Sequence, residues 1–220
     1  MSEGAWWDSF TEAGGLADLE TWLGGVDAPS RVRIRERIAE CHYETVLDCG
    51  AGLGLDLVGL QNVSFPVRYQ GIEPSAAMRE AAQRAAAAYS LEGDIPIVDG
   101  SIEAIPFGDS TFDLVYARHI LEHLPRVEVA LAEMVRVARL EVVVVFFMRP
   151  GAEDYLLRER DGLWQNVWAK SRLDAALAVN DKVFVSFYET LGTEVLLHAY
   201  LKDATVVEPE RVAARMRGDE

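Results

Sequence analysis

Short apolar runs rich in β-branched residues constrain the fold of this chain more than any other feature of its sequence. Five of them occur, at residues 45–47, 67–72, 95–98, 112–116 and 142–148. Runs that do not alternate with polar residues are typical of strands buried on both faces, as in a parallel sheet. We therefore expect the chain to fold around a mostly parallel sheet.

Helix-like stretches separate these runs, at residues 55–61, 75–90 and 126–139. Ser75 is suited to cap the second of them, and apolar residues recur at helical spacing in the third. Near the C-terminus, two strand-like runs at 182–190 and 194–201 are separated by three residues, which favours a hairpin. Strand and helix alternate along the chain, and an antiparallel pair is expected to close the sheet.

Length and charge limit the classes of function. The 220 residues suit one large globular domain. The 36 acidic and 21 basic residues leave a net charge of −15, which opposes binding to nucleic acid or an anionic membrane. Cys41 and Cys49 are too few for a disulfide framework, which favours the cytoplasm. Residues 1–15 lack a signal-peptide pattern and no apolar run reaches about 18 residues, so neither export nor membrane spanning is expected.

A glycine-rich turn at residues 50–54 follows the first predicted strand. Glycine lets the backbone approach a ligand closely, and the next helix offers free N–H donors. Asp48 precedes the turn, where its carboxylate suits a cationic ligand group. Glu73 ends the second predicted strand, where its oxygens can accept hydrogen bonds from both hydroxyls of a ribose. The pattern predicts a site for a nucleoside ligand.

The spacing of the glycines separates two kinds of nucleoside ligand. The dinucleotide fingerprint G-x-G-x-x-G would place its third glycine at position 55, but this position is Leu55. The third glycine of this turn is Gly54, one residue earlier. The acid before the turn would lie poorly beside a pyrophosphate but favourably beside the ammonium group of S-adenosylmethionine. The turn therefore favours the sulfonium cofactor.

Four motifs in this order resemble those of class I S-adenosylmethionine-dependent methyltransferases: D-C-G-A-G-L-G at 48–54, G-I-E-P-S at 71–75, I-P-F-G-D-S-T-F-D-L-V at 105–115 and I-L-E-H-L at 120–124. The resemblance covers residues 44–148, about half of the chain. It implies an α/β fold, a Rossmann-like seven-stranded αβα sandwich whose mostly parallel sheet ends in an antiparallel C-terminal hairpin. It also implies S-adenosyl-L-methionine as the cofactor.

The resemblance also implies roles for single residues. Glu73 would hold the ribose hydroxyls, and Met78 would lie near the adenine. Ser101 stands where the family commonly has an acid for the adenine amino group, and its uncharged hydroxyl would accept that bond less strongly. The connection at 136–141 lacks the glycine-containing turn that is usual before the fifth strand. The residues expected at the cofactor are Asp48, Gly50, Ala51, Gly52, Glu73, Pro74, Met78, Ser101, Ile102 and Ala117.

His119, Glu122 and His123 form the pattern H-x-x-E-H, which some zinc peptidases share. They follow a predicted strand and have no evident further ligand, so no metal is expected there. His119 is the candidate catalytic residue, because it follows a strand end that faces the cofactor and its imidazole could take a proton from the acceptor. A structural or substrate-orienting role is the alternative.

Two groups of side chains are assigned from spacing alone. Arginines at every second position from 31 to 37 scatter around a helix, which predicts a solvated helix. Leu163, Trp164, Val167 and Trp168 share one helical face, which belongs either to the core or to the acceptor site. Aromatic residues near the N-terminus could also cover the acceptor: Trp6, Trp7, Phe10 and Trp22.

The predicted organisation has three parts. Residues 1–43 form an N-terminal helical segment that could cap the substrate, residues 44–203 form the methyltransferase domain with a lid-like insertion at 150–180, and residues 204–220 form a tail. The predicted function is methyl transfer to a small-molecule acceptor by direct in-line attack. The alternatives are a non-catalytic interaction module with this fold and a nucleotide-dependent oxidoreductase.

Overall fold

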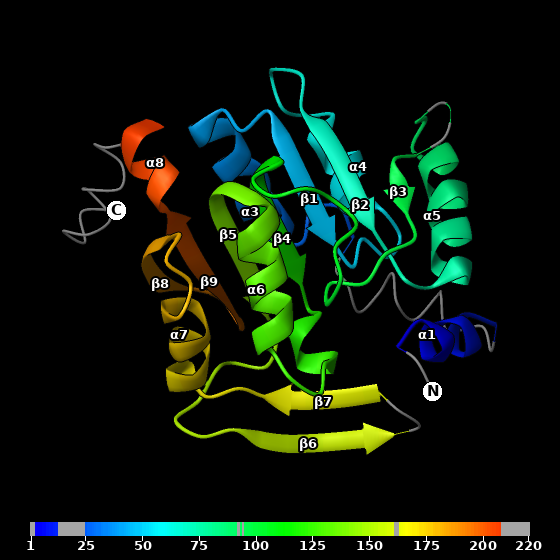
Figure 1. The fold of residues 1–220 in the computed structure, drawn as a ribbon. Coiled ribbons are helices and arrows are strands. Elements are labelled where there is room, and N and C mark those ends of the chain that lie inside the picture. The colour runs from blue at the N-terminus through cyan, green and yellow to red at the C-terminus, as the bar shows by residue number, and fades with distance from the viewer. Residues whose placement is uncertain (1–2, 13–24, 92, 94, 161–162, 208–220) are drawn as a thin grey trace.

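The computed structural model describes residues 3–12, 25–91, 93, 95–160 and 163–207. Within these ranges the main sheet is built from β1 (Thr45–Cys49), β2 (Arg68–Ile72), β3 (Ile97–Val98), β4 (Phe112–Arg118), β5 (Ala138–Phe146), β8 (Val183–Leu191) and β9 (Glu194–Leu201). Their order is β3-β2-β1-β4-β5-β9-β8 (Figure 1). The first five strands pair in parallel, whereas β9 is antiparallel to both β5 and β8. This arrangement confirms the predicted fold class, including the C-terminal hairpin.

The remaining described elements are α1 (Glu3–Glu12), α3 (Pro29–Cys41), α4 (Leu55–Leu60), α5 (Ala76–Ala88), a 3₁₀ turn η1 (Leu121–His123), α6 (Glu128–Val137), β6 (Tyr155–Arg160), β7 (Leu163–Val167), α7 (Lys170–Ala178) and α8 (Lys202–Val207). The predicted helices at 55–61, 75–90 and 126–139 agree with α4, α5 and α6 to within two residues at each end. The predicted cap of α5 is also confirmed, since Ser75 Oγ accepts a hydrogen bond from the backbone N of Met78 at 3.0 Å.

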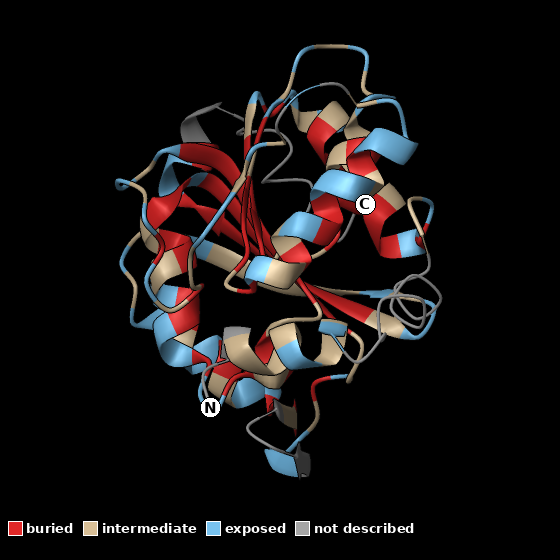
Figure 2. Ribbon diagram, turned by 90° about the vertical axis from the view of Figure 1, so that its right-hand side faces the viewer, coloured by how far each residue is buried: buried red, intermediate tan, exposed pale blue. Residues whose placement is uncertain are grey.

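Helices cover both faces of the sheet because its central strands are apolar on both. Val142 and Val144 of β5 pack in one buried cluster with residues of α6 and α7. Val143 and Val145 pack in a second cluster with residues of α3 on the opposite face. Figure 2 shows the buried residues concentrated in the sheet and on the helix surfaces turned toward it. The unalternating run in the sequence is thus explained by burial on both sides.

The segment at 163–168 does not form the predicted helical face. Residues 163–167 are β7, which pairs with β6 in a separate two-stranded antiparallel sheet, and α7 follows it. Trp168 is 3% exposed and its Nε1 donates to Leu121 O at 2.9 Å, so this residue belongs to the core. Trp164 is half-buried, and the side chain of Leu163 lies outside the described residues. A run of five residues is too short for its periodicity to separate a helix from a strand.

The arginines of α3 do not form a solvated face either. Arg31 is 5% and Arg37 is 1% exposed. Arg31 pairs with Asp56 at the start of α4, and Arg37 Nε donates to Glu141 Oε2 of β5 at 2.8 Å. Helical spacing gives the direction of each arginine side chain, but it does not reveal that carboxylates on other elements form ion pairs with two of them.

Two boundaries differ from the sequence analysis. β5 begins directly after α6, at Ala138, four residues before the strand predicted from 142, so helix and strand follow each other without a loop. At the C-terminal end, the predicted tail begins at 204, but Ala204 belongs to α8 and is buried against the sheet, and residues 208–220 lie outside the described residues. Among the described helices, none has the length and hydrophobicity needed to cross a membrane.

Candidate functional site

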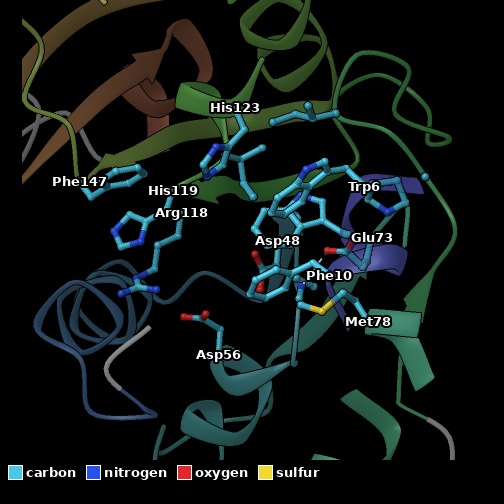
Figure 3. Close-up of a pocket in the computed structure, with 18 of the residues that line it drawn as sticks. Trp6, Phe10, Asp48, Asp56, Glu73, Met78, Arg118, His119, His123 and Phe147 are labelled. Carbon is cyan, nitrogen blue, oxygen red and sulfur yellow. Dashed lines mark hydrogen bonds between the residues drawn. The ribbon is translucent and has the colours of Figure 1, made fainter. Parts of the chain in front are cut away.

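A pocket of about 390 Å³ opens at the carboxyl ends of β1, β2 and β4. α1 and the β6–β7 hairpin lie at this same end of the sheet (Figure 1). Figure 3 shows two sides of the pocket with Asp48 between them: on one side Trp6, Phe10, Glu73 and Met78, on the other Arg118, His119 and Phe147. The strand ends therefore converge on one cavity, as is usual in open α/β sheets.

Most residues predicted at the cofactor line this pocket, namely Asp48, Gly50, Ala51, Gly52, Glu73, Pro74, Met78 and Ile102. Ser101 and Ala117 are not among the lining residues. Ser101 Oγ accepts a hydrogen bond from the backbone N of Glu103 at 3.2 Å within a local turn. Ala117 is fully buried in the cluster that includes α6 residues. The structure thus brings eight of the predicted residues together and leaves two outside the cavity wall.

The glycine turn is shaped for close approach. Gly50 has a φ of +79°, and a Cβ at this position would lie 2.3 Å from Ile120 Cδ1. A larger residue would therefore be strained in its backbone and would collide with Ile120. The turn is tied to β2, since the backbone N atoms of Gly50 and Ala51 both donate to Ile72 O, at 2.9 and 3.0 Å. Glycine here keeps the floor of the pocket free of side chains.

Glu73 is held at the end of β2 by two backbone donors. Its Oε2 accepts from Gly52 N and its Oε1 from Ser75 N, each at 3.0 Å. The residue is 5% exposed, and burial raises the pKa of its carboxyl to about 7, although the two backbone hydrogen bonds act against this. The carboxylate is therefore fixed in orientation, and each oxygen keeps further acceptor capacity toward the pocket.

Asp48, Arg31 and Asp56 form a buried group of charges beside the glycine turn. Asp48 Oδ2 accepts a hydrogen bond from Tyr69 Oη at 2.8 Å. Burial raises the pKa of Asp48 to about 6, although this hydrogen bond and the charge of Arg31 act to lower it. Burial also lowers the pKa of Arg31 to about 10, and the charge of Arg118 acts in the same direction. Within the described residues, Arg31 Nε and Asp56 Oδ1 have no hydrogen-bond partner. One unpaired donor and one unpaired acceptor therefore lie beside a pocket.

α1 brings aromatic side chains to the pocket. Trp6, Trp7 and Phe10 line it, and Trp6 stacks on Phe10 with 5.3 Å between ring centroids. The helix is fastened by Asp8, whose Oδ1 accepts from Ser75 Oγ at 2.6 Å and from Ala77 N at 3.1 Å at the first turn of α5. Three of the four aromatics predicted near the acceptor thus reach the cavity, and Trp22 lies outside the described residues.

The three residues of the H-x-x-E-H pattern make separate contacts. His119 Nε2 lies 2.5 Å from Glu194 Oε1, and His123 Nδ1 lies 2.8 Å from Trp164 O. Glu122 is fully buried, and its Oε1 accepts from the backbone N of Phe147 at 2.8 Å. Among the described residues, no three His, Cys, Asp or Glu side chains are grouped as a metal site would require. Glu122 instead holds the chain where it leaves β5.

Several lining residues were missed from the sequence, among them Arg31, Asp56, Arg118 and Phe147. Arg118 and Phe147 carried a usable signal, because each stands at the end of a predicted strand that leads to the ligand side of the sheet. Arg31 and Asp56 carried none, since they come from helices whose placement depends on the folded structure.

Known proteins resemble this chain in sequence and in fold. Residues 47–146 match the model of a family described as a methyltransferase domain. The matched range runs from β1 to the end of β5 and includes the glycine turn, Glu73 and His119. This part of the chain is therefore similar to a methyltransferase domain, as the sequence motifs predict.

Curated proteins similar to this chain include the ajmaline N-methyltransferase of Rauvolfia serpentina, which is 36% identical over 93 residues, 42% of this chain and 32% of that protein. The uncharacterized methyltransferase YcgJ of Bacillus subtilis is 28% identical over 124 residues, 56% of this chain and 48% of that protein. The chain thus spans about a third to a half of the length of these relatives.

Solved structures share the fold. Magnesium protoporphyrin IX methyltransferase from Synechocystis, with bound S-adenosylmethionine, superposes with a TM-score of 0.63 at 15% identity, over 92% of this chain and 98% of that one. The YcgJ crystal structure gives a TM-score of 0.59 at 16% identity, over 78% and 98% of the two chains. These likenesses show that the chain shares the fold of these structures.

Proposed function

We propose that this protein transfers a methyl group from S-adenosylmethionine to a small-molecule acceptor by direct in-line attack. The observation that carries the proposal is that Glu73, Asp48 and the glycine turn line the same pocket. A carboxylate with free acceptor capacity fits the two ribose hydroxyls, and a turn without side chains lets the backbone approach the ligand. Met78 and Ile102 supply an apolar surface for the adenine on the same wall.

The methionine portion of the cofactor is a zwitterion, and the pocket offers a matching pair of charges. Asp48 suits the ammonium group, as the sequence predicts. Arg31 suits the carboxylate, because its guanidinium lines the pocket and its Nε has no partner among the described residues. Hydrogen bonds to charged groups contribute about 1.5–3 kcal/mol each, so this pair would add substantially to affinity.

When bound, S-adenosylmethionine supplies a methyl group already activated by the sulfonium. The task of the protein is then to position the acceptor, and orientation alone can provide about 7–11 kcal/mol. In this proposal residues 1–43 cap the substrate through the aromatics of α1, and the insertion at 150–180 contributes Gln165 to the rim. A small acceptor is supported by the 390 Å³ volume and by the net charge of −15, which disfavours a polyanion.

The relatives support a small acceptor in general terms. One curated relative is named an ajmaline N-methyltransferase, and one solved structure of this fold is a geranyl diphosphate methyltransferase in complex with its substrate and sinefungin. Both names refer to small organic molecules with apolar parts. The aromatic side chains of α1 would give such a molecule a fitting surface.

Isothermal titration calorimetry with S-adenosylmethionine, S-adenosylhomocysteine and NAD tests the cofactor assignment. We expect S-adenosylmethionine and S-adenosylhomocysteine to bind. The Glu73→Gln variant should lose about 1.5–3 kcal/mol of their binding free energy. Tight binding of NAD without a response to the other two would overturn the proposal in favour of an oxidoreductase. A metabolite screen for a cofactor-dependent mass gain of one methyl group then separates an enzyme from a non-catalytic binding module.

A further inference from the structure

The side of the pocket opposite Glu73 ends at a histidine with an unusual backbone. His119 directly follows β4 and has a φ of +59°, although it is not glycine. Its backbone N donates to Val145 O at 2.9 Å, which ties this conformation to β5. Left-handed backbone at a non-glycine residue is strained and persists where the surroundings impose it, most often at functional sites.

The imidazole of His119 is paired with a carboxylate that the C-terminal hairpin supplies. Glu194, the first residue of β9, places Oε1 2.5 Å from His119 Nε2. The same oxygen accepts from Ser30 Oγ at 3.0 Å and from Arg118 Nη2 at 3.5 Å. Burial alone would raise the pKa of Glu194, but the hydrogen bond from His119 and the charge of Arg118 hold it below its ordinary value. Glu194 is therefore ionised at neutral pH.

An ionised carboxylate can only accept a hydrogen bond, and this determines the tautomer of the histidine. His119 Nε2 carries the hydrogen, and Nδ1 keeps its lone pair. Within the described part of the chain, His119 Nδ1 forms no hydrogen bond. It is also not one of the unpartnered side-chain atoms that are shielded from solvent, so it stays accessible. His119 lines the pocket, so our inference assigns this lone pair to the cavity side.

Burial and two arginines favour the neutral form of His119. Burial lowers the pKa of His119 most, and the charges of Arg118 of β4 and Arg31 of α3 act in the same direction, against the hydrogen bond that His119 donates to Glu194 of β9 and the charge of that carboxylate. The neighbouring surface is aromatic: Phe147 meets the imidazole edge-on with 5.3 Å between centroids. A neutral base beside an apolar ring thus lies at the far end of the pocket from Glu73 (Figure 3).

We propose that His119 is the proton acceptor for methyl transfer, that Glu194 positions it, and that the acceptor is a hydroxyl on an aromatic framework. This inference rests on the proposed function. The hydroxyl oxygen forms a bond to the methyl carbon, and the carbon–sulfur bond breaks with its electron pair staying on sulfur. The hydroxyl proton moves to His119 Nδ1 and later to water. The products are a methyl ether and S-adenosylhomocysteine, so atoms and charge balance.

A phenolic hydroxyl fits this base better than the other nucleophiles. Its ordinary pKa is about 10, within reach of an imidazole, whereas an aliphatic alcohol is far less acidic. A protonated amine would bring a positive charge next to Arg118 and Arg31, which already face this end of the pocket. The wall of Phe147 and Ile120 is suited to the ring that carries the hydroxyl.

The first test reads the histidine directly. Nitrogen-15 NMR of the complex with S-adenosylhomocysteine should show one imidazole as the neutral Nε2–H tautomer, and this signal should disappear in His119→Gln. The chain has four histidines, so assignment by substitution is practicable, and His42→Asn on the exposed surface serves as the control. In Glu194→Gln the single tautomer should be lost, and Glu194→Asp should restore it in part. A charged imidazole or an Nδ1–H tautomer in the complex would overturn the inference.

The second test uses phenol and 4-nitrophenol as acceptors. 4-Nitrophenol is ionised near neutral pH and needs no base, so His119→Gln should lower kcat with phenol about 100-fold or more and with 4-nitrophenol far less. Equal losses with both, or methylation of benzylamine in preference to either phenol, would overturn the assignment. Failure of S-adenosylhomocysteine to bind in the same samples would contradict the proposed function instead, so the two failures are distinguishable.

Discussion

Two buried arginines on the same helix have opposite surroundings. Arg37, in the second half of α3, donates to Glu141 and lies over the ring of Tyr200 at 5.0 Å from its centroid. Arg31, six residues earlier, pairs with Asp56 but also faces Arg118 and the pocket. Burial by itself lowers the pKa of both guanidinium groups. The charge of Glu141 raises the pKa of Arg37 above its ordinary value, whereas that of Arg31 falls to about 10.

The carboxylates show the same contrast. Glu141 accepts from Arg37, from Tyr43 Oη at 2.8 Å and from His198 Nδ1 at 2.8 Å, and these partners lower its pKa to about 2 against burial. Asp48 beside Arg31 has a pKa raised to about 6. Arg37 and Glu141 therefore compensate each other within the fold, whereas Arg31 and Asp48, although each has a partner, also border a pocket where a ligand can add to their pairing.

The largest expected effect comes from removing the arginine that serves the fold. Arg37→Met should lower the free energy of unfolding by about 3–5 kcal/mol, because Glu141 would remain buried without its cation. Urea denaturation measures this loss. The double variant Arg37→Met/Glu141→Gln should recover part of it. A loss below about 1 kcal/mol in the free energy of unfolding of Arg37→Met would contradict the assignment of Arg37 to the stability of the fold.

The arginine at the pocket should affect binding in addition to the stability that is lost when Asp56 stays buried without its cation. Arg31→Met should weaken S-adenosylhomocysteine binding by about 1.5–3 kcal/mol, because the ligand carboxylate loses its cation. 5′-Methylthioadenosine, which lacks the amino-acid portion, should bind the variant as it binds the unmodified protein. Calorimetry with both ligands makes the comparison, and parallel losses would assign Arg31 to the fold.

Proton linkage should also differ between the two regions. The pKa of Glu73 is raised to about 7, and the ribose hydroxyls favour its ionised form, so binding below pH 7 must displace a proton. Affinity for S-adenosylhomocysteine should therefore fall as the pH decreases from 7 toward 5, by at most about tenfold per pH unit for this group. Glu73→Gln should bind more weakly and with a flatter pH profile. The same steep profile in Glu73→Gln would assign the dependence to Asp48.

The smallest effect is expected where an ion pair is exposed. Arg68 and Glu44 approach to 3.9 Å, but their side chains are 76% and 72% exposed. Arg68→Ala should change the free energy of unfolding by no more than about 0.5 kcal/mol, because solvent screens the pair. Urea denaturation of Arg68→Ala and of Arg37→Met then compares the free energy of unfolding lost with an exposed ion pair and with a buried one.

The main sheet and half of the pocket were predictable from the sequence because their signals are local. The apolar run of β5, the glycines at 50–54 and the acid at 73 each encode their structure within a few residues. Parallel strands then bring the ends of β1, β2 and β4 to one edge by topology alone. The cofactor side of the pocket follows from these two facts.

The other half depends on contacts between residues far apart in the chain. His119 and Glu194 are 75 positions apart, Arg37 and Glu141 are 104 apart, and neither partner carries a local signal for the other. The β7 segment could be read as a helix because its pairing with β6 is a tertiary fact. The sequence by itself determined the sheet, the glycine turn and the acid at its side. Only the tertiary structure decided which charges are paired and which face the pocket, because the burial and pairing of a charge depend on the elements packed around it.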